Sequence, residues 1–292
     1  MKIKSFAKIN LGLEIIGVRP DGYHEIRTMF QAVDLFDEME FEPAGDGLIK
    51  LEGSGDSIPW DETNLVFKAA EALKRMTGQK AGISIRVTKK IPGGRGLGGG
   101  SSNAAMTLLV LDRLWNLNLG LRNLSNIAVD LGADVAYFLH GGLCLGQGLG
   151  EELTELEDLP STACLIGWPD FPVSTRAAYE AFSASLTSAG NASRIKRFKK
   201  DGEYGFLEND LEAVVLAAHP EIAGLKRYFQ EKGAALALMS GSGSAVFGLF
   251  PDGAKARSAS QEAMEKGSLI LARTLTRKDY WNGIGAGASP SW

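Results

Sequence analysis

The chain contains 292 residues, enough for two domains of roughly 150 residues each. Hydrophobic residues make up 45% and charged residues 23%, which excludes a disordered or collagen-like chain. With 31 basic and 35 acidic residues the formal net charge is −4, so no general positive field attracts nucleic acid or an anionic membrane. We expect a small-molecule substrate, with no nucleic-acid or membrane partner.

The cysteine content and the N-terminal segment bear on location. Cys144 and Cys164 are too few for a disulfide scaffold and read as free thiols in a reducing compartment. The first ten residues read as a strand with interspersed lysines, not as a targeting segment, and no apolar run approaches the roughly 18 residues of a membrane span. We expect a soluble, cytoplasmic protein.

Alternating apolar and polar residues predict a half-buried strand over residues 7–15. Its second face carries Lys8, Asn10 and Glu14. Residues 33–41 repeat the alternation, interrupted by Asp37, and residues 48–51 are β-compatible. We expect an antiparallel meander at the start of the chain.

A helix is predicted after Asn64, because apolar residues recur on one face from residue 65 to 76 and Gly78 is a suitable stop. Residues 83–87 alternate as a strand, and residues 105–117 favour a helix. A glycine-rich loop lies between these two elements. The order is therefore strand, glycine loop, helix.

The second half mixes strands and helices without strict alternation, which indicates an α+β architecture. An acidic run and Pro160 favour a domain boundary near residue 153. Helices are predicted at 178–183, 211–218, 222–229 and through Ala263, and strands at 235–239, 245–250 and 269–275. Residues 283–292 are predicted to form a loose tail.

Five glycines lie within seven positions, before a helical turn with no acidic side chain. They are Gly94, Gly96, Gly98, Gly99 and Gly100. Glycine lets main-chain N–H groups approach a ligand, and a helix N-terminus adds free donors and partial positive charge. The pattern predicts a phosphate cradle. A flexible linker is the alternative, but it does not explain a position between a strand and an apolar-faced helix.

Two other phosphate loops fit less well. A P-loop requires Lys after its second glycine, where Gly100 follows Gly99. Gly94, Gly96 and Gly99 satisfy the dinucleotide pattern G-x-G-x-x-G. However, the predicted antiparallel start and the lack of a strand-ending acid about 20 residues later argue against that interpretation.

The segment PGGRGLGGGSSNAA, residues 92–105, resembles the ATP loop of the GHMP kinases. Four further segments resemble the members of this family that act on a cytidine diphosphate derivative, and all five are collinear over nearly the whole chain. They are KINLGLEI (8–15), RPDGYHEIRTMFQAVDL (19–35), GADVAYFLHGG (132–142) and MSGSGSAVF (239–247).

This resemblance implies an α+β, two-domain GHMP kinase fold with the active site between the domains. Residues 1–153 would form an ATP-binding domain of the ribosomal protein S5 domain 2 type, and residues 154–292 a ferredoxin-like domain. The implied activity is transfer of a phosphoryl group from ATP, with Mg²⁺, to a hydroxyl of a cytidine diphosphate derivative. The turn at residues 240–244 would face the phosphates; the alternative is an ordinary hairpin.

Nucleotide contacts are implied along the loop and beside the adenine. The loop residues are Pro92, Gly93, Gly94, Arg95, Gly96, Leu97, Gly98, Gly99, Gly100, Ser101, Ser102 and Asn103, and the adenine neighbours are Asn64 and Lys89. Asn64 on its own reads as a helix cap. The Ser102 hydroxyl is a candidate neighbour for Mg²⁺, but no metal-ligand motif assigns a protein ligand. Arg95 stands where a small residue is expected.

Catalysis is implied for Asp134, as the base that accepts the hydroxyl proton, and for Lys8, as its partner. On sequence alone Asp134 equally suits a helix cap, and Lys8 reads as a solvated strand residue. Phosphoryl transfer needs mainly alignment and neutralisation of charge, so a carboxylate, a lysine and a main-chain cradle can suffice. Asn10 shares the strand face of Lys8 and is implied to contact substrate.

Tyr23, His24 and Tyr179 are implied to bind the cytosine ring, with Tyr23 and Tyr179 stacking on it and His24 reading its edge. By composition alone, Asp21-Gly22 marks a turn and Tyr23 a packing residue.

Two other functions stay open. A GHMP kinase acting on homoserine, mevalonate or a sugar would share the loop, but would not be expected to carry DGYHEIRTMFQ. A nucleotide-binding regulator without catalysis would be expected to lose Lys8 or Asp134, and both are present.

Overall fold

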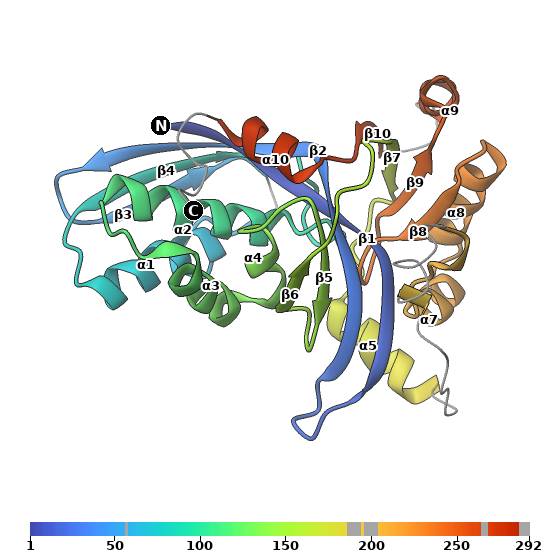
Figure 1. Ribbon diagram of the computed structural model, residues 1–292, viewed down its shortest axis with the longest axis horizontal. Coiled ribbons are helices and arrows are strands. Elements are labelled where there is room, and N and C mark those ends of the chain that lie inside the picture. Colours follow the sequence, from blue (N-terminus) through green and yellow to red (C-terminus); the bar gives the residue numbers. More distant parts are fainter. Residues whose placement is uncertain (56–57, 186–193, 196–203, 264–267, 286–292) are drawn as a thin grey trace.

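The computed structural model describes the chain except residues 56–57, 186–193, 196–203, 264–267 and 286–292. Two sheets pack through the apolar face of the first two strands (Figure 1). Helices cover the outer face of each sheet. The molecule is therefore an α+β protein, as the sequence predicts.

The first sheet is built on a long antiparallel hairpin of β1 (Lys2–Val18) and β2 (His24–Ala44). Its strand order is β3-β4-β2-β5-β6, with β1 paired to β2. The remaining strands are β3 (Ile49–Gly53), β4 (Gly82–Thr88), β5 (Leu143–Gln147) and β6 (Glu152–Glu155). The predicted meander is wrong at β3, which pairs in parallel with β4 instead of continuing from β2.

The predicted alternation on β1 is confirmed, but the strand is buried on both faces. Its apolar residues Ala7, Ile9 and Leu11 pack toward the second sheet. Lys8 and Asn10, on the opposite face, are each only 2% exposed. The expectation of a solvated Lys8 is therefore wrong, because helices and loops of the first domain cover that face.

Four helices cover the first sheet: α1 (Leu65–Thr77), α2 (Gly99–Leu114), α3 (Gly120–Leu131) and α4 (Ala133–Tyr137) (Figure 1). Helix α1 begins after the cap Asn64 and ends at Gly78 in the left-handed conformation, as predicted. Helix α2 ends earlier than predicted, at Leu114. Asn116 and Asn118, with φ of 51° and 53°, leave the helical conformation just beyond it.

The second sheet has the antiparallel order β10-β7-β9-β8. Its strands are β7 (Ala163–Trp168), β8 (Leu236–Met239), β9 (Val246–Phe250) and β10 (Ser268–Arg273). The helical elements of this half are α5 (Thr175–Ser185), η1 (Tyr204–Phe206), α7 (Glu212–Ala218), α8 (Pro220–Glu231) and α9 (Gly253–Ala263). An antiparallel four-stranded sheet with helices on one face agrees with the implied ferredoxin-like architecture.

The C-terminal segment returns to the first sheet. Helix α10 (Arg277–Ile284) lies against the start of β1, with the rings of Phe6 and Tyr280 5.7 Å apart (Figure 1). The predicted loose tail therefore begins too early, since Gly283 and Ile284 are helical, and residues 286–292 lie outside the described part. The expected boundary at residue 153 falls within β6 and stays a prediction.

Candidate active site

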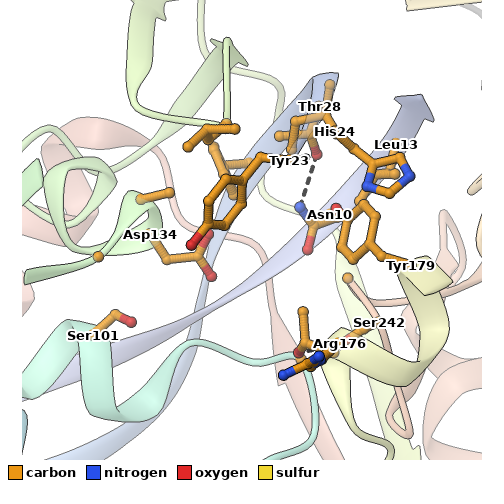
Figure 2. A pocket seen from close by; sticks show the side chains of 18 of the residues that line it. Asn10, Leu13, Tyr23, His24, Thr28, Ser101, Asp134, Arg176, Tyr179 and Ser242 are labelled. Carbon is orange, nitrogen blue, oxygen red and sulfur yellow. Dashed lines mark hydrogen bonds between the residues drawn. The ribbon is translucent and has the colours of Figure 1, made fainter. Parts of the chain in front are cut away.

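A cavity of about 1090 Å³ lies where β1, β2 and the glycine loop meet α4, α5 and the β8–β9 turn (Figure 2). Small-molecule sites usually measure about 300–1,000 Å³, so this one accommodates a large ligand or parts of two. All six residues predicted for catalysis or substrate binding line it: Lys8, Asn10, Tyr23, His24, Asp134 and Tyr179. Of the predicted nucleotide residues, Gly96 and Ser101 also line it.

Lys8 and Asp134 form an ion pair on the wall of the cavity. The Lys8 Nζ and Asp134 Oδ2 atoms are 3.3 Å apart, with the lysine side chain 3% exposed and the carboxylate 36% exposed. Gly132, with φ of 156°, is the N-cap of α4, so Asp134 lies in the first turn and does not cap the helix. There the helix dipole favours a negative charge.

Asn10 ties Lys8 to the middle of the hairpin. The Lys8 Nζ donates to Asn10 Oδ1 (2.5 Å), and Asn10 Nδ2 donates to Thr28 Oγ1 (2.8 Å; Figure 2). Thr28 in turn donates to the Gly12 carbonyl at a register shift in β1. This chain of bonds fixes the direction of the buried ammonium group, which also lies 5.3 Å from the centroid of the Phe30 ring.

Three aromatic side chains, Tyr23, His24 and Tyr179, line the same cavity. The His24 and Tyr179 rings are 5.0 Å apart, and the Nε2 atom of His24 lies 2.6 Å from the Ser183 hydroxyl. Tyr23 is 64% exposed and faces the cavity from the opposite side (Figure 2). Partial burial lowers the pKa of His24 below its usual value, and burial raises the pKa of Tyr179. The neutral forms of both rings are therefore favoured at neutral pH.

The glycine loop has the predicted backbone. Gly94, Gly96 and Gly98 have φ of 66°, 78° and 70°, and α2 begins at Gly99. The first N–H groups of α2 lack acceptors within the helix and are free to bind an anion.

At Gly96 and Gly98 the packing of the protein already requires glycine, independently of any ligand. A Cβ on Gly96 would lie 2.0 Å from the Ser240 carbonyl, and one on Gly98 would lie 2.8 Å from the Phe138 ring. A Gly98→Val substitution would therefore disturb packing inside the protein as well as any contact with a ligand. Gly100 differs, because its nearest neighbour to a Cβ is Leu65 Cδ1 at 3.9 Å.

Asp37 organises the base of the loop. Its buried carboxylate accepts from the main-chain nitrogens of Lys90 (2.7 Å) and Ile91 (2.8 Å) and pairs with the Lys89 ammonium. Lys89 also donates to Asn103 (3.0 Å). Lys89 and Asn103 thus belong to the bonded group that anchors the loop, and neither lines the cavity.

The other predicted nucleotide residues occupy several environments. The Ser102 hydroxyl is buried against Ser5 (2.7 Å), whereas Ser101 lines the cavity. Asn64 caps α1 by accepting from Val66 (2.9 Å). Pro92, Gly93, Gly94, Arg95, Leu97, Gly98, Gly99 and Gly100 complete the loop outside the cavity wall.

Six polar residues of the wall were not predicted as site residues: Asp21, Thr28, Thr175, Arg176, Glu180 and Ser183. Ser242, also on the wall, belongs to the turn at residues 240–244. The Thr175 and Ser242 hydroxyls are 2.8 Å apart, and Arg176 lies beside Ser242 (Figure 2). Arg176 pairs with Glu180 (2.7 Å). The available signal for an anion site was a basic residue, Arg176, two residues before the helix predicted at 178–183.

Magnesium requires oxygen ligands, and phosphate oxygens supply most of them in nucleotide sites. In the described ranges, no group of three or more His, Cys, Asp or Glu side chains could hold a metal ion. The Ser101 hydroxyl and the Asp134 carboxylate do line the cavity and have the chemistry that Mg²⁺ accepts. In the same ranges, no helix is long and apolar enough to cross a bilayer.

Two sequence profiles match the chain. The profile of the GHMP kinases N terminal domain matches residues 64–142, and that of the GHMP kinases C terminal matches residues 185–268. A 4-diphosphocytidyl-2-C-methyl-D-erythritol kinase from Syntrophus aciditrophicus (strain SB) is 43% identical over 261 residues, covering 89% of this chain and 93% of its own.

Solved structures agree with these matches. A 4-(cytidine 5'-diphospho)-2C-methyl-D-erythritol kinase superposes with a TM-score of 0.81 at 34% identity, covering 94% of this chain and 99% of its own. A homoserine kinase from Cytophaga hutchinsonii ATCC 33406 has a TM-score of 0.71 at 21% identity, with coverages of 94% and 95%. The second likeness shows the fold alone.

Proposed function

Because the chain belongs to the GHMP kinase family, among the 4-diphosphocytidyl-2-C-methyl-D-erythritol kinases, we propose the corresponding reaction. The chain transfers a phosphoryl group from ATP to the 2-hydroxyl of 4-diphosphocytidyl-2-C-methyl-D-erythritol, in the non-mevalonate route to isoprenoid precursors. The single observation that carries this proposal is one cavity lined both by the Lys8–Asp134 pair and by Tyr23, His24 and Tyr179.

Asp134 is the general base in this proposal. Its partly exposed carboxylate accepts the proton of the attacking hydroxyl, whose oxygen then bonds to the γ-phosphorus of ATP as ADP leaves. Lys8, oriented by Asn10, pairs with the carboxylate and supplies positive charge where negative charge develops. Their direct contact supports a joint role.

The glycine loop and the start of α2 hold the ATP phosphates through main-chain N–H groups. Ser101 and Asp134 are the cavity residues that would approach Mg²⁺. When bound, Mg²⁺ neutralises phosphate charge.

Tyr23 and Tyr179 stack on the cytosine ring, and neutral His24 reads its polar edge. Among the described residues of the cavity wall, Arg176 carries the permanent positive charge other than Lys8. With the Thr175 and Ser242 hydroxyls beside it, Arg176 binds the substrate diphosphate.

The cellular setting and the domain division are proposals of the same kind. The free, buried thiols of Cys144 and Cys164 suit the cytoplasm. The chain divides near residue 153 into an ATP-binding unit and a ferredoxin-like unit, and α10 returns from the second to the first.

A coupled ATP-consumption assay over a panel of hydroxyl compounds tests the proposed function. The panel contains 4-diphosphocytidyl-2-C-methyl-D-erythritol, homoserine, mevalonate and galactose. We expect efficient turnover of the cytidine compound alone. Preferred turnover of any other member would contradict the proposal.

A further inference from the structure

Arg95 interrupts the glycine loop with a long, charged side chain that does not point into the cavity. Its Nη1 donates to the carbonyl oxygens of Pro169 and Phe171 and lies 3.1 Å from the Ser244 hydroxyl. All three partners belong to the second half of the chain. The guanidinium group therefore joins the glycine loop to two segments more than 70 residues away.

The segment held by Arg95 leads directly into the substrate end of the cavity. Pro169 and Phe171 lie between β7 and α5, and α5 begins at Thr175. Its first two turns carry Thr175, Arg176 and Tyr179 on the cavity wall. The position of these side chains thus depends on a strand-to-helix connection that the glycine loop fastens.

Main-chain contacts strengthen the same junction. Ala245 N donates to the Arg95 carbonyl (3.1 Å), and Ser240 Oγ donates to the Gly96 carbonyl (2.8 Å). Ser244 Oγ donates to the Phe171 carbonyl (2.7 Å). The glycine loop, the β8–β9 turn and the β7–α5 connection are therefore each bonded to the other two, and this set of contacts forms a triangle. Within this triangle the Arg95 side chain links the loop directly to the connection.

We propose that Arg95 is a positioning residue that holds the glycine loop and the start of α5 in one arrangement, so that nucleotide and cytidine compound both bind more tightly. The inference rests on the proposed function for the identity of the two ligands. Hydrogen bonds from a charged donor to main-chain carbonyls are stronger than neutral ones, and preorganisation reduces the ordering cost of binding. Arg95 acts on both ligands through the segments it fastens.

The test compares Arg95→Met, which keeps side-chain length without donors, and Arg95→Lys, which keeps charge without the planar fork. Arg75→Met is the matched control, because Arg75 lies on α1 with its side chain 76% exposed. Calorimetry gives dissociation constants for a non-hydrolysable ATP analogue and, separately, for cytidine diphosphate. Thermal unfolding and steady-state kinetics follow on the same proteins.

For Arg95→Met we expect both dissociation constants and both KM values to rise about tenfold, with kcat changed less than about twofold. Arg95→Lys should fall between wild type and Arg95→Met, and Arg75→Met should match wild type. A purely structural role would lower the unfolding temperature and leave both dissociation constants unchanged. That result, or a change for one ligand only, would overturn the proposal.

The two proposals fail in different ways. Wild-type protein that binds neither ligand would remove the proposed function, and the role of Arg95 with it. Wild-type protein that binds both ligands, with Arg95→Lys and Arg95→Met binding equally well, would remove the role of Arg95 alone. If Arg95→Met does not fold, the milder Arg95→Lys decides, and wild-type affinity for both ligands in that variant would refute the inference.

Discussion

The two ends of the cavity are built differently. At the nucleotide end, Asp37 holds the glycine loop from below and the β8–β9 turn holds it from the side. At the cytidine end, Tyr23 is 64% exposed in the turn at the tip of the β1–β2 hairpin, which extends beyond the body of the protein (Figure 1). The His24 Nε2 atom lies 2.6 Å from the hydroxyl of Ser183, near the end of α5. We infer a preformed phosphate end and a base end that ligand binding completes.

The largest effect is expected between the two ends, at the ion pair. Asp134→Asn should lower kcat by about 10² to 10⁴, because proton removal loses its base, while ATP affinity changes little. Lys8→Met should lower kcat in the same way. Asp130→Asn, which changes an exposed carboxylate near the end of α3, serves as control in steady-state assays. Full turnover by Asp134→Asn would refute the base assignment.

The next largest effect is expected at Tyr23, in the cytidine end of the cavity. Tyr23→Ala should weaken binding of the cytidine substrate by about 1–3 kcal/mol through lost stacking, and leave the KM for ATP unchanged. The unfolding temperature should stay constant because the ring is exposed. Val18→Ala changes another exposed residue of the hairpin and is the control. An unchanged KM for the cytidine substrate would remove Tyr23 from the site.

A smaller effect is expected at Gly100, in the nucleotide end of the cavity. Substitution there should change the stability of the protein and its affinity for ATP in opposite directions. Gly100→Ala should stabilise the fold by up to about 1 kcal/mol, because alanine favours the helix and its Cβ meets no close neighbour. The same Cβ should weaken ATP binding by about 1–3 kcal/mol by crowding the phosphates. Calorimetry and thermal unfolding measure both changes.

Gly224→Ala is the control for this pair, since a Cβ there meets nothing within 4 Å and Gly224 lies in α8, outside the cavity wall. Unchanged ATP affinity in a stable Gly100→Ala protein would contradict a phosphate cradle at the start of α2.

The smallest effect concerns pH. Burial lowers the pKa of His24 in the folded protein, so the unfolded chain takes up the proton first as the pH falls below about 6.5. The folded state is therefore favoured by neutral His24 at higher pH, and the free energy of unfolding decreases as the pH falls. The fall in unfolding temperature between pH 7.5 and 5.5 should be smaller for His24→Asn than for wild type. An equal fall would exclude His24 as its source.

Local patterns predicted the elements that carry the site. Alternation placed Lys8 and Asn10 on one strand face, and the glycines before an apolar-faced helix predicted the loop at the start of α2. The burial of that strand face could not be predicted, because it depends on what packs over it after folding. Local sequence likewise cannot reveal the pairing of β3 with β4, which is set by the position of α1 between them.

The contacts of Asp37 and Arg95 could not be predicted, because they join segments that are far apart in the sequence. Asp37 interrupts an apolar alternation, yet its four-way contact with the loop appears only when β2, β4 and α2 meet. Arg95 departs from the expected small residue, but its partners lie in the other half of the chain. Sequence spacing identifies chemistry within a segment, whereas contacts between segments require the fold.

The comparison of kcat/KM for three compounds tests the central claim most directly: the full cytidine substrate, its uridine analogue and the isolated methylerythritol fragment. Binding energy at the base end should position the reacting hydroxyl, so the fragment should be a poor substrate. The uridine analogue should also lose efficiency, because a carbonyl in place of an amino donor leaves polar groups mispaired. Equal kcat/KM values for all three would contradict a kinase that reads cytosine.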